Sequence, residues 1–148
     1  MELEKFNWLK NRYRLYLFSH VLVIIAVIIF FRVIPDIKMA ALAAATLFIS
    51  GPLLVLFFEL KSGSFGRSLS FYGALIFFFA SSLPIFALRI SNWDERFENL
   101  SLPSVLGGFT GPQLHQVSNY FFLGMVATFA LDSLIATSKA RAKIKSDT

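Results

Sequence analysis

The sequence contains no cysteine among its 148 residues. Disulfide bonds, thiolate metal sites, iron–sulfur clusters and cysteine nucleophiles are therefore excluded. Charged residues are scarce as well, because Asp, Glu, Lys and Arg make up 16% of the chain, against about 25% in soluble domains. Hydrophobic residues reach 56%, and phenylalanine alone occurs 18 times. A soluble protein of this length cannot keep so much apolar surface out of water, so the composition indicates an integral membrane protein.

The sequence motifs of common enzymes are missing too. There is no HExxH motif, no glycine-rich phosphate loop and no pair of carboxylates with the spacing that intramembrane hydrolases need. The two histidines, His20 and His115, lie in segments that we expect on opposite sides of the membrane, which argues against a haem held by both. We therefore expect no cofactor and no metal, and the sequence gives no positive indication of an enzyme.

Four continuous hydrophobic runs are present instead, each close to the roughly 20 residues that a helix needs to cross a bilayer. They cover residues 15–34, 39–60, 69–90 and 117–137. The runs do not alternate between apolar and polar residues, so helices rather than a β-barrel are predicted. The first run is too long for a signal peptide and has no cleavage pattern. We therefore predict an all-α fold, a polytopic transmembrane four-helix bundle over residues 15–137.

The distribution of Lys and Arg predicts how this bundle is oriented. Ten of the 14 basic residues lie on the side that holds both termini. They are Lys5, Lys10, Arg12, Arg14, Lys61, Arg67, Lys139, Arg141, Lys143 and Lys145. The richer side is expected to be cytoplasmic. This places the basic segments 1–14 and 138–148 in the cytoplasm and residues 91–116 outside, with the plasma membrane (the inner membrane of a bacterium) as the location.

The net charge of +5 is explained by this orientation signal, and no nucleic-acid-binding module accompanies it, so no nucleic-acid partner is expected. The basic cytoplasmic ends are expected to contact anionic lipid headgroups. Arg32 and Arg89 end hydrophobic runs on the outer side, where we expect them to act as interfacial anchors.

The third link, residues 91–116, is the only long one. Residues 91–94 and 92–95 both match the capping box that starts a helix. Trp93, Phe97 and Leu100 share one helical face, which predicts a short amphipathic helix lying in the outer interface. The stretch 102–112 is apolar for a loop, and it either dips between the spans or packs on their outer ends; the second arrangement is favoured.

Asp132 lies inside the fourth hydrophobic run. An ionisable group at a helix centre costs about 2.5–3.5 kcal/mol on insertion scales, and less near the end, so it rarely faces lipid. Gly124, Thr128, Asp132 and Ala136 recur every four residues and form a candidate helix-packing face. Asp132 is either a carboxylate that carries a proton or binds a cation, or a residue with no such role, which makes a polar contact between helices or stays hydrated near the interface; the second interpretation is favoured.

His20 and Glu59 are two further candidate functional residues. His20 shares a face of the first span with Tyr13 and Tyr16, and it is a haem ligand, a proton relay, a partner for Asp132, or the donor of a simple helix–helix hydrogen bond, which is favoured. Glu59 closes the second span two residues before Lys61, so we expect a solvated pair at the interface.

Three classes of function remain open. The favoured one is a non-catalytic subunit or accessory factor, which packs against other membrane proteins or against itself. The second is a small oligomeric transporter or channel that uses Asp132 and His20. The third is a lipid-active enzyme at the outer interface, where His115 and the acids Asp94, Glu95 and Glu98 would act.

Overall fold

The computed structural model describes residues 2–63, 66–93, 95–104 and 107–146, and within them the side chains between residues 12 and 142. This part of the chain is helical apart from short turns and the third link. The link contains an isolated antiparallel bridge between Ser101 and Thr110. The elements in chain order are α1 (Glu2–Val33), α2 (Ile37–Lys61), α3 (Leu69–Phe77), the π-helix η1 (Phe78–Ser82), α4 (Leu83–Ser91), the 3-10 helix η2 (Phe97–Asn99) and α5 (Gly111–Ser146).

Four helices are long and apolar enough to span a membrane, which confirms the four predicted helical runs. Because α3, η1 and α4 follow one another without a break, they form one of the four. The apolar segments are Arg12–Val33, Ile37–Lys61, Leu69–Ser91 and Gly111–Ala142. The first and last helices extend beyond their hydrophobic runs, so the described parts of the basic terminal segments are also helical.

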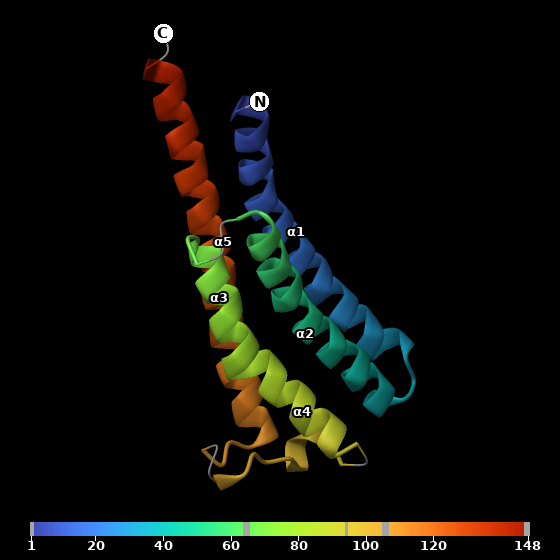
Figure 1. Cartoon of the computed structure of the whole chain (residues 1–148). Coiled ribbons are helices and arrows are strands. Elements are labelled where there is room, and N and C mark those ends of the chain that lie inside the picture. The colour runs from blue at the N-terminus through green and yellow to red at the C-terminus, as the bar shows by residue number, and fades with distance from the viewer. Residues whose placement is uncertain (1, 64–65, 94, 105–106, 147–148) are drawn as a thin grey trace.

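The helices form a ring in which sequence neighbours are antiparallel (Figure 1). α1 packs against α2 and α5, and α3 packs against α2 and α5. The last helix therefore closes the bundle beside the first, as the long third link allows. Both termini lie at one end, which we call the terminal end, and the third link lies at the other, the link end (Figure 1).

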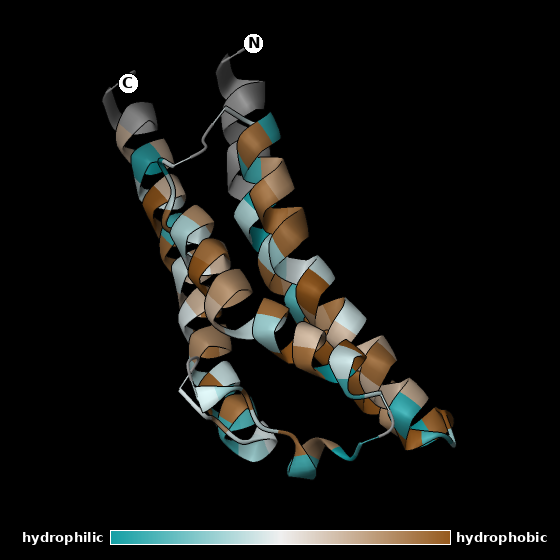
Figure 2. Cartoon of the chain, turned by 60° about the horizontal axis from the view of Figure 1, so that its bottom comes forward, coloured by the Kyte–Doolittle hydropathy of each residue, from teal (hydrophilic) through white to brown (hydrophobic). Residues whose placement is uncertain are grey.

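The outer surface of the bundle is largely apolar, and its interior holds polar and charged side chains beside the hydrophobic core. Large hydrophobic side chains are exposed along all four helices, among them Ile28, Leu54, Phe79, Leu123 and Leu134. Hydrophobic residues, brown in Figure 2, occur along much of each helix. Several polar and charged side chains are buried between the helices, namely Arg12, His20, Glu59, Ser68, Ser70, Ser81, Ser82, Arg89, Ser118 and Asp132. A protein surrounded by water exposes most of its charged side chains and buries most of its large apolar ones. The exposure of side chains here therefore agrees with a bundle surrounded by lipid.

The two short links contain the residue types that stop and start helices. Asp36 caps α2 by accepting a hydrogen bond from the backbone N–H of Lys38 at 2.8 Å, and Ser68 caps α3 by accepting one from Phe71 N–H at 3.1 Å. Gly63 follows the end of α2 with a φ of 68°, a left-handed conformation in which a Cβ would clash. These turns are tight, so they hold successive helices side by side.

Two prolines alter the helical hydrogen bonding at the centre of the bundle. Pro52 has no N–H, so the carbonyl of Phe48 one turn earlier loses its donor. The hydroxyl of Ser82, on the neighbouring helix, donates to this carbonyl at 3.0 Å. Pro84 follows the π-helix η1, in which the N–H of Leu83 bonds to Phe78, five residues back. The bundle thus satisfies at least one backbone group that a proline frees, as a membrane interior requires.

The predicted amphipathic helix in the third link is wrong. α4 continues to Ser91, whose hydroxyl donates to the carbonyl of Ala87 at 2.8 Å instead of capping a new helix. Beyond it, the described residues of the link contain 3-10 turns, at Phe97–Asn99 and at Ser104, and no α-helix before Gly111. The capping-box pattern was therefore misleading, because Ser91 was already part of the preceding helix.

The link packs on the ends of α4 and α5. Leu100 is 4% exposed and packs with Leu88 of α4 and Leu114 of α5. The N–H of Leu102 donates to the carbonyl of Phe109 at 2.8 Å, so the two arms of the stretch 102–112 pair with each other. This agrees with the favoured arrangement; residues 105 and 106 lie outside the described part of the chain.

α5 begins at Gly111, six residues before the start of the predicted fourth run. The side-chain oxygen of Gln113 accepts hydrogen bonds from the backbone N–H and the hydroxyl of Thr110, at 2.9 and 3.1 Å. The sequence Thr-x-x-Gln is itself a capping box, and Pro112 suits a first helical turn because its missing N–H would have had no partner there. The helix therefore starts at a polar cap before its apolar face begins.

Candidate functional site

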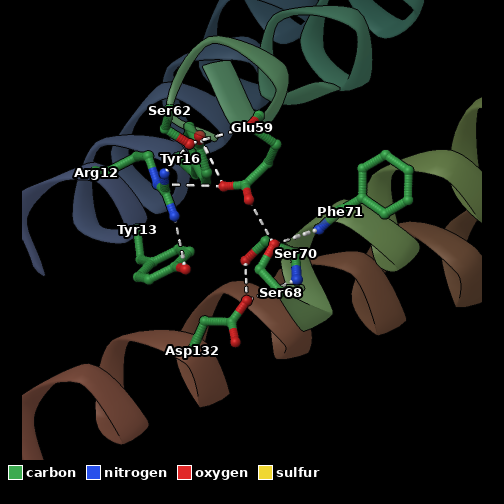
Figure 3. Close-up of polar contacts among 9 residues, drawn as sticks. All are labelled: Arg12, Tyr13, Tyr16, Glu59, Ser62, Ser68, Ser70, Phe71 and Asp132. Carbon is green, nitrogen blue, oxygen red and sulfur yellow. Dashed lines mark hydrogen bonds and ion pairs between the residues drawn. The ribbon is translucent and has the colours of Figure 1, made fainter. Parts of the chain in front are cut away.

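A buried group of polar side chains lies inside the bundle near the terminal end. We call it the polar cluster, and it consists of Arg12, Tyr13, Tyr16, Glu59, Ser62, Ser68, Ser70 and Asp132 (Figure 3). These residues come from α1, α2, α5, the short second link and the start of α3. The cluster therefore connects all four long helices at one depth, although its members are far apart in the sequence.

Glu59 is the centre of the cluster. Its side chain is 0% exposed and its Oε1 lies 3.2 Å from Nε of Arg12, which is 2% exposed. The hydroxyl of Tyr16 donates to Oε1 at 3.1 Å, and the hydroxyl of Ser68 donates to Oε2 at 2.6 Å. Glu59 is thus not a solvated partner of Lys61, as the sequence analysis expected, because the helix turns it inward while Lys61 stays exposed.

Arg12 reaches the cluster from α1. It donates one hydrogen bond to Ser62 and another to the hydroxyl of Tyr13 at 2.7 Å, and its guanidinium lies 4.7 Å from the centre of the Tyr13 ring. From the sequence, Arg12 is predicted only as one of the basic residues that orient the chain in a membrane. Arg12 and Tyr16 are one helical turn apart, so they share a face of α1. This spacing could have predicted from the sequence that both side chains face the interior.

Asp132 completes the cluster from α5. Its Oδ2 accepts hydrogen bonds from the backbone N–H of Ser70 at 2.7 Å and from the Ser70 hydroxyl at 2.6 Å, and the residue is 7% exposed. Ser70 lies in the first turn of α3, where backbone N–H groups lack partners and the helix dipole favours negative charge. The favoured interpretation of Asp132 as a polar contact between helices agrees with these bonds.

The structure does not bring His20 and Asp132 together. His20 is 3% exposed, and its Nδ1 lies 2.8 Å from the carbonyl oxygen of Tyr16, so Nδ1 is the protonated nitrogen because a carbonyl only accepts. Its Nε2 is buried without a hydrogen-bond partner among the described residues. Gly51 of α2 makes room for the ring, since a Cβ there would lie 3.1 Å from Nε2. The favoured interpretation of His20 as a hydrogen bond between helices is therefore wrong for the described residues, because its ring nitrogens contact polar atoms of α1 alone. His20 instead packs α1 against α2 and the aromatic rings of α5.

The candidate packing face on α5 is used mainly within the chain. A Cβ at Gly73 of α3 would overlap the side chain of Thr128, so these two positions are in close contact. Asp132 bonds to the same helix, and Ala136 packs on the hydrophobic core. Gly124 is different, because no atom lies within 4 Å of where its Cβ would be and the residue is exposed.

A pocket of about 850 Å³ lies between the helices near the link end. Its apolar wall includes Val27, Phe31, Ala41, Ala44, Phe48 and Ile85, from α1, α2 and α4. Polar residues of the link and of the helix ends complete it, including Lys38, Arg89, Glu95, Arg96, Glu98 and His115. We call this space the link-end pocket. Its volume lies within the range of about 300–1,000 Å³ that is usual for sites that bind small molecules.

His115 and Arg89, two residues that the sequence singled out, line this pocket and differ in exposure. His115 is exposed, as expected of a residue near the outer interface. Arg89 is only 5% exposed, so it is not the snorkelling anchor that the sequence analysis expected. Its Nη1 donates to the backbone carbonyl of Glu95 at 3.2 Å, and its guanidinium lies 5.7 Å from the centre of the Phe97 ring.

Within the described part of the chain, no three His, Cys, Asp or Glu side chains are placed to hold a metal ion. No family model matches this chain, and no curated protein or solved structure is similar to it. The polar cluster and the link-end pocket are therefore the two features of the structure that bear on function.

Proposed function

We propose that this chain is a small transporter of membrane lipid, which takes a lipid into the link-end pocket and passes its head group through the bundle. The observation behind this proposal is the difference between the two ends. Near the link end, the helices leave a pocket of about 850 Å³ with an apolar wall and a polar rim. At the terminal end, the polar cluster joins the four long helices.

An alternating-access carrier has this asymmetry, because one end must be closed while the other receives the solute. The apolar wall suits acyl chains, and the charged residues of the rim suit a head group. With the orientation proposed from the Lys and Arg distribution, the pocket would face the outer side and the closed end would face the cytoplasm. Residues of the polar cluster, Asp132 included, would then act as the inner closure.

Lipid movement in vesicles tests this proposal. The purified chain is reconstituted into phosphatidylcholine vesicles that contain a fluorescently labelled phospholipid in both leaflets, and dithionite is added outside. Dithionite destroys only the outer label, so transport increases the total loss of fluorescence above that of protein-free vesicles. We expect such an increase for the wild-type chain.

A pair of variants on α2 makes the test specific to the pocket. Ala41 lines the pocket, whereas Ala43 does not, and both are partly exposed. Ala41→Trp should fill the pocket and abolish the additional loss of fluorescence, while Ala43→Trp should leave it unchanged. The proposal fails if the wild-type chain gives no additional loss, or if both variants behave alike.

A second function, the accessory subunit favoured by the sequence, has one supporting observation. Gly124 is an exposed glycine in the middle of α5 with nothing within 4 Å of its Cβ position, and a small residue on a lipid-facing surface allows another helix to approach closely. Gly124→Leu should leave insertion and the stability of the purified chain unchanged but reduce recovery of partner subunits, or of a second copy, from mild detergent. Unchanged recovery would remove this interpretation.

A further inference from the structure

We infer that Arg89 is the phosphate-binding residue of the link-end pocket, and that the ligand is a phospholipid with its acyl chains along the apolar wall. This inference rests on the proposed function, since it assumes that the pocket receives lipid, and it adds the class of lipid and the residue that selects it.

Arg89 is a buried cation that has no ion pair with a described carboxylate. Arg89 is 5% exposed, and an arginine side chain remains charged in proteins. Among the residues that the structure describes, Arg12 and Glu59 form an ion pair with an N–O distance below 4.0 Å. No described carboxylate lies this close to the guanidinium of Arg89. Glu98 acts on Arg89 only through its charge at longer range. Buried charges inside membrane helices normally have a close partner.

The guanidinium is also held in place. One of its five N–H groups donates to the carbonyl of Glu95, and the ring of Phe97 lies 5.7 Å from its central carbon. Arg89 lines the pocket together with these residues. A planar guanidinium fixed from one side presents its remaining N–H groups in a fork that matches two oxygens of a phosphate.

The surroundings favour an amphiphile over a free anion. The pocket continues from Arg89 along Ile85 and Ser82 of the same helix and across to Ala44 and Phe48 of α2. These residues offer apolar surface and one hydroxyl, and that hydroxyl already donates to the Phe48 carbonyl. An inorganic phosphate would leave this wall uncovered, whereas a phospholipid places its phosphate on Arg89 and its chains on the wall.

Lipid retention measured by native mass spectrometry tests the inference. The chain is purified in detergent micelles that contain equal amounts of dioleoyl phosphatidylcholine and dioleoylglycerol, which have the same chains but differ in the phosphate head group. We expect the wild-type chain to retain the phospholipid in preference by about tenfold, as one charge-assisted interaction implies. Adding inorganic phosphate at a concentration equal to that of the phospholipid should not displace it.

Three variants assign the preference to Arg89. Arg89→Gln should retain both lipids about equally, and Arg89→Lys should give an intermediate ratio because a lysine keeps the charge but loses the fork. The control is Arg32→Gln, since Arg32 is an exposed arginine near the end of α1 that does not line the pocket, and it should keep the wild-type ratio. Circular dichroism checks the fold, and if Arg89→Gln does not fold, Arg89→Lys decides.

The outcomes separate the two proposals. Equal retention of both lipids by the wild-type chain, or an unchanged preference in Arg89→Gln and Arg89→Lys, overturns the phosphate site and leaves lipid uptake standing. Retention of neither lipid removes the proposed function itself. Displacement of the phospholipid by equimolar inorganic phosphate would also contradict the inference, because it would show that the site recognises a free anion.

Discussion

The ion pair between Arg12 and Glu59 gives the sharpest test of the structure. Replacing Arg12 with leucine leaves a carboxylate that is 0% exposed without its cation. Removing one partner of a buried ion pair typically costs about 3–5 kcal/mol, whereas an exposed pair contributes about 0.2–1 kcal/mol. We therefore expect Arg12→Leu to lower the free energy of unfolding by about 3 kcal/mol or more.

Lys61 supplies the matched control. It lies two residues from Glu59 on the same helix but is exposed, and it is the partner that the sequence alone suggests. Lys61→Leu should change the free energy of unfolding by no more than about 0.5 kcal/mol, as is usual for surface substitutions. Unfolding is followed by circular dichroism in mixed micelles of dodecyl maltoside with increasing dodecyl sulfate.

A double-mutant cycle completes the argument. Arg12→Leu and Glu59→Leu should each be strongly destabilising, but the double variant should lose far less than their sum, because no unpaired charge remains buried. The interaction energy should be at least about 2 kcal/mol, in the upper part of the range for residues in contact. Additive losses, or a larger effect of Lys61→Leu than of Arg12→Leu, would refute the arrangement of the polar cluster.

Three further predictions follow from the bundle. Asp132→Leu should lower the free energy of unfolding by about 1–3 kcal/mol, because it leaves buried donors at the start of α3 unpaired. Asp132→Asn keeps a hydrogen-bond acceptor, so its free energy of unfolding should fall by less. Equal losses in the two variants would contradict the hydrogen bonds of Asp132. Gly73→Leu should cost about 1–3 kcal/mol by overpacking against α5, whereas Gly124→Leu should be neutral in detergent melts. For orientation, single cysteines at Ser101 and Ser146 are labelled in intact cells with an impermeant maleimide, and only position 101 should react; the reverse pattern would invert the topology.

Some of the functional features were visible in the sequence only as isolated residues. Glu59, Asp132 and His20 stand out as ionisable groups in apolar runs. An inward position of Asp132 and His20 follows from the high cost of exposing charge to lipid, whereas Glu59, at the end of its run, was expected to be solvated. Their partners do not follow, because Arg12, Ser68 and Ser70 are common residue types near helix ends. Which of them faces a carboxylate depends on the rotation of each helix about its own axis.

The sequence by itself determined the number, type and order of the long helices. Length and hydropathy are properties of a single segment, and lipid forces each such segment to satisfy its backbone as a helix. The short turns, with Asp36 at one and Ser68 at the other, then require antiparallel neighbours. The exact start of α5 was missed, because its cap lies outside the apolar run.

The tertiary structure alone decided the polar cluster, the link-end pocket and the burial of Arg89. The π-helix before Pro84 lies between α3, which packs on α5, and α4, which packs mainly on α2. Where helices separate, a pocket with residues from four helices forms, and where they converge, Arg12 meets Glu59. The hydrogen bonds of the polar cluster join residues up to 62 positions apart, and no local pattern specifies them, because they depend on how whole helices pack.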